Sequence, residues 1–372
     1  MEPQMFIPVV DPIPLPAPFW LFKLLLVVTF VLHIIAMNVM FGGGVLAAFA
    51  KFRSGQGENY QRLFGDVTHT IPTFLAATIT LGIPPLLFLQ VLYGQYFYTS
   101  SVIMAWPWFF VVILITLAYY GFYLVSFKQK TIPGAVGWVL LSSVLLIFVV
   151  GFIFSNNVML MSSPEKWSAK YFADPNGWNL NLDEQTLIPR FLHFFVAAIA
   201  VGGLFIAYLG IFRWKKNNGY ARFLIKFGGK SFLYLTMVQF MVGLWFLVSL
   251  PGEKMMLFMG GNMLATVALL LGIMGGLAAI FIMSDALRND DPRKGVYLSS
   301  GVIALVVILM TTMREILRDA YLADYFKPAH FAIHTQWSVM LIFFVAFLAG
   351  IGLWMTMIKK YFFSPNLRAK MH

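Results

Sequence analysis

The chain has 372 residues, of which 60% are hydrophobic and 11% are charged, and it carries a formal net charge of +11. A soluble enzyme of this size needs far more charge to cover its surface, and the long uninterrupted apolar runs exclude an outer-membrane barrel, whose strands alternate in polarity. Because cysteine is absent, disulfides, iron–sulfur clusters, thiolate zinc sites and covalently attached c-type heme are excluded as well.

Nine apolar segments are each long enough to cross a bilayer, so the sequence predicts an all-α polytopic membrane bundle. We expect these spans at about residues 20–48, 67–95, 102–127, 135–155, 190–212, 231–250, 259–284, 296–313 and 335–358. Together they are predicted to form a single integral membrane domain over residues 1–372.

Most of the 26 Lys and Arg residues lie in the connections that follow odd-numbered spans or in the C-terminal tail. The positive-inside rule places these segments in the cytoplasm, and therefore the N-terminus outside and the C-terminus inside. Residues 1–18 then form an outer N-terminal segment, residues 158–189 an outer loop, and residues 213–230 a basic cytoplasmic loop. Attraction of basic loops to anionic lipid headgroups accounts for the net charge, so we expect a bilayer and no nucleic acid as partner.

The first two spans each contain one histidine. A polar side chain in hydrocarbon costs about 2.5 to 3.5 kcal/mol, so a histidine inside the membrane needs a compensating role. His33 lies well inside the first span and is a candidate heme ligand; the alternative is a histidine that hydrogen-bonds to a neighbouring helix. His69 lies near the cytoplasmic end of the second span. We interpret it first as a structural residue and second as a ligand on the inner side.

The fifth and seventh spans both start from the outer side, with His193 just inside the fifth and Met263 just inside the seventh. An imidazole and a thioether at matching depth on separate helices can axially ligate a low-spin heme iron. For Met263 considered alone, packing between helices is the simpler explanation, because the chain contains 21 methionines. The pairing of the two residues nevertheless predicts an electron-transfer site.

The eighth span ends in a charged segment, in which Arg314 and Arg318 share one helix face and Glu315 and Asp319 the adjoining one. Guanidinium groups near the water boundary suit heme propionates, which need charge-assisted donors. A helix-end cluster of salt bridges is the alternative interpretation.

His330 and His334 lie four residues apart, on one helix face, as the ninth span begins at the outer side. Both are candidate ligands of a heme iron or contacts of its propionates. The alternative is an interfacial pair that hydrogen-bonds to loop carbonyls.

Five short segments match a known family in order and placement. They are residues 29–33 (TFVLH), 41–44 (FGGG), 62–65 (RLFG), 155–159 (SNNVM) and 191–198 (FLHFFVAA). In these segments and in its nine spans the chain resembles subunit I of the cytochrome bd quinol oxidases. The resemblance implies that His193 and Met263 take the places of the low-spin heme b ligands, and His33 that of a ligand in the paired high-spin center.

Three features depart from this family. The connection at residues 251–256 replaces a long outer quinol-binding loop, and the third span lacks the family's glutamates, which argues against a conventional terminal oxidase. The family's eighth-helix signature has a ligating glutamate three residues ahead of an arginine; with Arg314 as that arginine, Thr311 occupies the glutamate position. His330 or His334 could then replace the carboxylate. An imidazole in place of the carboxylate would favour an iron that carries electrons over one with an open position for reaction.

The sequence therefore predicts a diverged bd-like membrane cytochrome with two or three b-type hemes near the outer side, with heme d the less favoured alternative. It would carry electrons between a quinone pool and a periplasmic c-type cytochrome or a terminal acceptor, beside a second membrane subunit in the prokaryotic cytoplasmic membrane. One alternative is an oxygen-reducing terminal oxidase subunit. Another is a heme-free transporter or assembly subunit, although paired inverted repeats are not evident and acids inside the spans are few.

Overall fold

The computed structural model describes residues 8, 14–174, 176–214, 218–327 and 331–363. Within these ranges the chain contains helices and no β-strand, and nine helices are long and apolar enough to cross a membrane. The prediction of an all-α polytopic bundle is confirmed. The chain divides into two compact units, one made of Met1–Pro8 and Leu25–Phe326 and the other of Val9–Leu24 and Lys327–His372. That both units act as one heme-binding domain stays a prediction.

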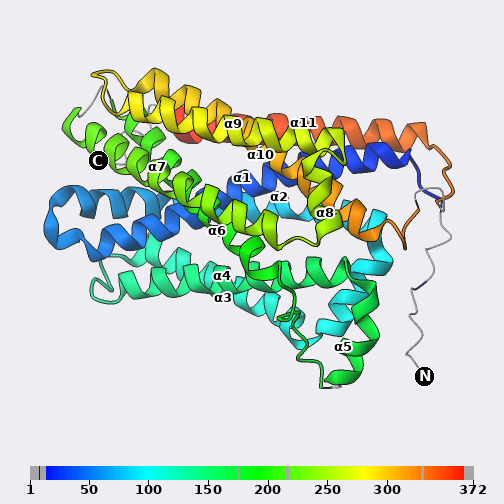
Figure 1. Ribbon diagram of the computed structural model, residues 1–372. Helices are drawn as coiled ribbons and strands as arrows, with labels where there is room; N and C mark the ends of the chain where they lie inside the picture. Colours follow the sequence, from blue (N-terminus) through cyan, green and yellow to red (C-terminus); the bar gives the residue numbers. More distant parts are fainter. Residues whose placement is uncertain (1–7, 9–13, 175, 215–217, 328–330, 364–372) are drawn as a thin grey trace. The chain divides into compact units, whose positions relative to one another are not determined.

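The nine long helices follow the predicted spans in order and mostly extend beyond them. They are α1 (Phe19–Phe52), α2 (Glu58–Met104), α3 (Trp106–Lys128), α4 (Val136–Met161), α6 (Leu187–Phe212), α7 (Asn218–Ser249), α9 (Met263–Ala286), α10 (Arg293–Leu322) and α11 (Trp337–Phe363) (Figure 1). Backbone hydrogen bonding continues past the apolar run because polar side chains at a helix end can reach water. The largest extension is in α2, whose three internal prolines do not end the helix; its backbone leaves helical angles only at Tyr93.

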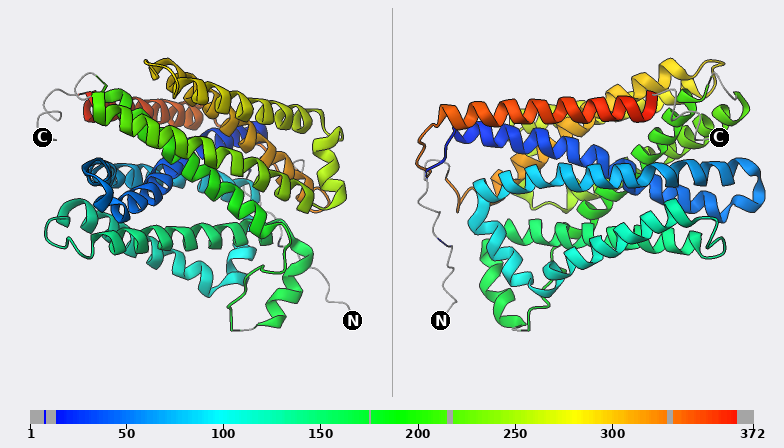
Figure 2. Two further views of the ribbon diagram at one scale, coloured as in Figure 1. Left: turned by 60° about the vertical axis from the view of Figure 1, so that its left-hand side comes forward. Right: turned by 180° about the vertical axis from the view of Figure 1, so that it is seen from behind.

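Segments predicted as loops contain helix. Helix α7 begins at Asn218, so most of the basic segment 213–230 is helical rather than a loop; Lys and Arg are good helix formers and keep the backbone hydrogen bonds intact. Helix α4 runs to Met161, and the shortened connection to α6 holds η2 (Pro164–Lys166) and α5 (Trp167–Ala173) at one end of the first unit (Figure 2). The connection after α7 holds α8 (Gly252–Met256) and η3 (Leu257–Met259).

Helix pairs α3 with α4, α6 with α7, and α9 with α10 pack against each other (Figure 1). Helix α1 crosses α6 where Gly42 meets Gly202. A Cβ on Gly42 would lie 2.0 Å from the carbonyl oxygen of Ala198, and one on Gly202 would lie 2.3 Å from the carbonyl carbon of Gly42. Small residues allow membrane helices this close approach. The crossing fixes α1 against α6, the two helices that carry His33 and His193.

The second unit ties the segment before α1 to the segment before α11. The N–H of Leu15 donates to the carbonyl of Ala332 (2.8 Å), and the carbonyl of Leu15 accepts from the N–H of His334 (3.0 Å). The N–H of Gln336 donates to the carbonyl of Pro16 (3.0 Å). These backbone bonds hold the start of α11 beside the chain that leads into α1.

Candidate functional site

His33 lies on α1 and faces α2. Its Nδ1 lies 3.0 Å from the carbonyl oxygen of Thr78, and because a carbonyl oxygen only accepts, Nδ1 carries the proton of this hydrogen bond. Gly82, one turn further along α2, leaves room for the ring: a Cβ there would lie 3.0 Å from Nδ1 and from Cε1. In the neutral imidazole, Nε2 is then unprotonated and free to act as a ligand, which is the usual arrangement of metal-ligating histidines.

Arg314, Glu315 and Arg318 form a charged group near the end of α10, named the α10 cluster here. Glu315 accepts hydrogen bonds from Nη1 of Arg314 (3.0 Å) and Nη1 of Arg318 (2.7 Å). Glu315 is 5% exposed and Arg318 3%. The guanidinium carbon of Arg314 lies 4.2 Å from the centre of the Phe30 ring, which is itself 6.3 Å from the ring centre of His33. The α10 cluster therefore lies next to His33.

His193 lies on α6 and faces α7. A Cβ on Gly243 would lie 3.0 Å from Cε1 of His193, so this glycine leaves room for the imidazole. The side-chain amide of Gln239 donates to the backbone carbonyl of His193 (2.8 Å). Nδ1 of His193 is buried and has no hydrogen-bond partner in the part of the chain that the structure describes. Helix α7 thus positions the imidazole while one of its ring nitrogens stays unpaired.

Arg190 lies one turn before His193 on α6. Among the described residues it has no ion-pair partner, and its guanidinium carbon lies 5.3 Å from the ring centre of Phe246. Arg190 is close enough to Arg314 and Arg318 for the like charges to interact. The His193 side of the unit and the His33 side therefore share one basic region.

This basic region has buried donors that the described residues leave unpaired. Three guanidinium groups, those of Arg190, Arg314 and Arg318, lie near Glu315, which pairs with the last two. Within the described residues, Nε and Nη2 of Arg318 are buried without a hydrogen-bond partner. Buried donors left unpaired are costly, so their presence points to a ligand that accepts hydrogen bonds. A ligand with carboxylates would supply acceptor oxygens for these donors.

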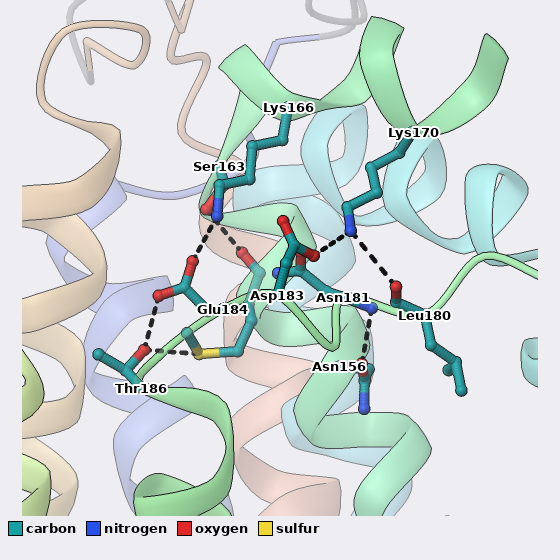
Figure 3. A network of polar contacts seen from close by, with 10 residues as sticks. Asn156, Ser163, Lys166, Lys170, Leu180, Asn181, Asp183, Glu184 and Thr186 are labelled. Carbon is teal, nitrogen blue, oxygen red and sulfur yellow. Dashed lines mark hydrogen bonds and ion pairs between the residues drawn. The ribbon is translucent and has the colours of Figure 1, made fainter. Parts of the chain in front are cut away.

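In the connection between α4 and α6, by contrast, the charged side chains of Lys166, Lys170, Asp183 and Glu184 are paired (Figure 3). Lys166 donates to Glu184 (2.6 Å), Thr186 also donates to Glu184 (3.0 Å), and Lys170 binds Asp183. The hydrogen bond from Lys170 holds the pKa of the Asp183 carboxyl below its ordinary value. Since these charges satisfy one another, the connection is a structural clamp on the start of α6.

Two other candidates, Met263 and His69, are not brought into this region. Met263 is the first residue of α9 and is 80% exposed, so the described residues do not enclose its thioether. His334 is exposed and belongs to the second unit. His330 lies outside the described residues, and His69 is exposed on α2. Their roles as ligands stay predictions.

Two residues of the site, Glu315 and Arg190, were not predicted to bind a ligand. Glu315 lies three residues ahead of Arg318, so the glutamate-to-arginine spacing is present one turn later than in the pairing of Thr311 with Arg314. The buried ion pair between Glu315 and Arg318 favours this later register. Arg190 precedes His193 by three residues, which places both on one face of α6. Both spacings were signals in the sequence.

The donor set suits a heme better than a bare metal ion. Within the described residues, no three His, Asp or Glu side chains converge as a metal-ion site. An iron porphyrin needs only one or two axial donors, and His33 and His193 each offer one. The unpaired N–H groups of Arg318 suit the carboxylates of a porphyrin.

No family model matches the sequence, and no curated protein matches it. Three solved chains match it. One of them comes from the structure of bd oxidase from Geobacillus thermodenitrificans, with a TM-score of 0.71 and 12% sequence identity, over 95% of this chain and 100% of that chain. At this identity the comparison establishes the fold. The predicted bd-like fold is therefore confirmed.

Proposed function

We propose that this protein is a heme-binding electron-transfer subunit of a bd-like membrane oxidoreductase. The observation that carries the proposal is the position of two imidazoles inside spans, those of His33 and His193. Beside them Arg190 has no ion-pair partner, and Arg318 has two buried nitrogens without a hydrogen-bond partner, among the residues that the structure describes. A transporter or a heme-free scaffold gives no reason to keep unpaired guanidinium groups next to histidines in an apolar bundle. The bd-like fold supports the same interpretation.

In this proposal His33 and His193 are axial ligands of separate b-type hemes, and Arg190, Arg314 and Arg318 bind heme carboxylates. Two or three hemes are proposed, with heme d not favoured. When bound, heme supplies reversible one-electron transfer, while the chain supplies ligation, low-dielectric surroundings and counter-charge. Met263 stays the proposed second ligand of the His193 iron, although its 80% exposure opposes that role.

The proposed partners rest on the resemblance to bd oxidases. They are a second membrane subunit, a quinone or quinol, and a periplasmic c-type cytochrome or another terminal acceptor, in a prokaryotic cytoplasmic membrane. At the end of α7 the connection contains only α8 and η3 before α9 begins. This short connection favours a quinone site elsewhere or electron exchange with a cytochrome.

A pyridine hemochromogen spectrum of the purified full-length protein tests the proposal. We expect b-type bands and two or three hemes per chain. The substitution His193→Ala should remove the low-spin signal from the dithionite-reduced spectrum while the helix content, measured by circular dichroism, stays unchanged. A colourless preparation from heme-replete cells would overturn the proposal, and an unchanged spectrum in the variant would overturn the role of His193.

An oxygen-reducing subunit is a second candidate, and Glu315 favours it. The chain keeps a buried carboxylate three residues ahead of Arg318, so histidine need not replace a carboxylate ligand. Against this candidate, α3 contains no Asp or Glu that could deliver protons. Carbon monoxide added to the reduced protein distinguishes the two: a spectral shift indicates an open iron, and no shift indicates a closed electron carrier.

A further inference from the structure

Three basic residues follow one side of the first turns of α7. Arg222, Lys226 and Lys230 are four residues apart, and all three are exposed. The same side of the helix then continues with exposed apolar and aromatic side chains: Tyr234, Val238, Met241, Trp245 and Val248. Along one helix face, cations are thus followed by an aromatic ring and then by apolar surface, which matches the headgroup, interface and acyl region of a lipid leaflet.

The connection between α9 and α10 lies beside this stripe. A Cβ on Gly229 would lie 2.9 Å from Cδ2 of Leu287, which places the end of α9 against the first turns of α7. Arg288, the next residue, is exposed. The basic side chains of Lys226, Lys230 and Arg288 therefore gather at one end of the first unit.

Nearby carboxylates are already engaged. Asp285 accepts a hydrogen bond from the side-chain amide four residues later, and Asp290 lies 3.8 Å from Arg222. Asp291 accepts from Arg293 at 2.6 Å, and these hydrogen bonds lower the pKa of Asp291 to about 2. Each of these three acids thus already has a partner within the chain.

Lys226, Lys230 and Arg288, in contrast, have no ion-pair partner among the residues that the structure describes. We propose that these three side chains bind the phosphates of an anionic phospholipid whose acyl chains lie along the apolar side of α7. Three uncompensated cations suit a headgroup with two phosphates, such as that of cardiolipin, better than a single phosphate. Free phosphate would use the charges but not the exposed apolar surface that continues from them.

Lipid binding to the purified full-length protein in neutral detergent, measured by native mass spectrometry, tests this inference. We expect cardiolipin to bind in preference to phosphatidylcholine. The triple variant Lys226→Gln, Lys230→Gln and Arg288→Gln should lose on the order of 100-fold in affinity for cardiolipin, because each cation near a membrane surface contributes about a fivefold factor.

A control variant removes the same number of charges from exposed residues at the same end of the first unit: Arg53→Gln, Lys128→Gln and Lys130→Gln. It should bind cardiolipin like the unmodified protein. Equal loss in both variants would show a net-charge effect only and would overturn the site. So would equal binding of phosphatidylcholine, full displacement by inorganic phosphate, or retained affinity in the first triple variant.

Folding of the variants is checked by helix content and by elution as a single species. If the first triple variant fails this check, the single variants Lys226→Gln and Lys230→Gln carry the test, each with about a fivefold expected loss. The charge-preserving variant Lys226→Arg should keep the affinity. A fivefold loss in Lys226→Arg as well would mean that packing, not charge, accounts for binding.

Discussion

Two charged groups in the first unit differ in how fully their members are paired. On α2, Asp66 accepts from Nη1 and Nη2 of Arg213 (2.5 and 2.8 Å) and from the hydroxyl of Tyr220 (2.5 Å). In the α10 cluster, Glu315 binds two arginines, yet Arg318 still has buried N–H groups without acceptors among the described residues. The first group is complete within the protein, and the second is not.

This difference separates a structural role from a binding role more clearly than residue type does. Asp66, Arg213 and Tyr220 join the start of α2, the end of α6 and the start of α7, and their bidentate geometry uses both carboxylate oxygens. Burying arginines with too few hydrogen-bond acceptors destabilises the α10 cluster. Such a cost is expected where a bound ligand accepts the remaining hydrogen bonds.

The largest expected effect is loss of heme from the variant His33→Ala. Its imidazole adjoins the α10 cluster, and the hydrogen bond of its Nδ1 to the carbonyl of Thr78 leaves Nε2 as the donor to iron. The same substitution at His69, which is exposed three residues after Asp66 on α2, should leave the heme content unchanged. Heme per chain, measured by pyridine hemochromogen, compares the two variants; equal loss in both would contradict the distinction between the two regions.

The second largest effect is on stability, in the variant Asp66→Ala. Removing this carboxylate leaves Arg213 and Tyr220 without their acceptor, and since the pair is about a quarter exposed, we expect a cost of about 2 to 3 kcal/mol. The midpoint of thermal unfolding in detergent should fall while heme per chain stays constant. The variant Asp66→Asn, which keeps one acceptor oxygen, should fall less. An unchanged midpoint for Asp66→Ala would show that the group is no structural anchor.

For Arg190→Gln we expect a smaller effect of the opposite kind from Asp66→Ala: heme binding weakens, and the stability of the heme-free chain does not fall. Loss of one guanidinium should weaken heme binding about tenfold, which corresponds to about 1.4 kcal/mol for one charge-assisted hydrogen bond. The heme-free chain should keep or gain stability, because Arg190 repels Arg314 and Arg318. Heme transfer to an apoprotein acceptor measures the first effect and thermal unfolding of the heme-free chain the second. Destabilisation like that of Asp66→Ala would mean that Arg190 is structural.

The fold was predictable because apolar length alone identifies spans, and all nine were found in order. Helix ends were not, since backbone hydrogen bonding continues where the side chains turn polar, as in α2 and in the first turns of α7. The prolines of α2 illustrate the limit: residue type suggests a break, but the helix continues through Pro72 and Pro84 and deviates only at Tyr93. In a membrane bundle, neighbouring helices compensate for the lost hydrogen bonds.

The site was only partly predictable. His33 and His193 stand out as polar residues in apolar runs, whereas the carbonyl of Thr78 that orients His33 has no sequence signature, because every residue has a carbonyl. The pairing of Glu315 with Arg318 was present as a spacing, but choosing it over Thr311 with Arg314 needed the burial of the ion pair. The sequence indicated that Met263 lies at the same depth in its span as His193, but it could not predict that the Met263 side chain is 80% exposed.

The smallest expected effect concerns the ion pair of Lys170 with Asp183 in the connection between α4 and α6 (Figure 3). Because the folded pKa of Asp183 is lowered from its ordinary value of 3.8, the pair stabilises the fold above that pH, and the contribution is lost as the pH falls through the lower folded pKa. Asp183 is 58% exposed, so Lys170→Gln should cost only about 0.2 to 1 kcal/mol near neutral pH. Thermal unfolding of both proteins at neutral pH and at strongly acidic pH measures it: the two midpoints should converge in acid. A midpoint difference that persists in acid would mean that Lys170 acts through its other contact, the carbonyl of Leu180, and not through the charge of Asp183.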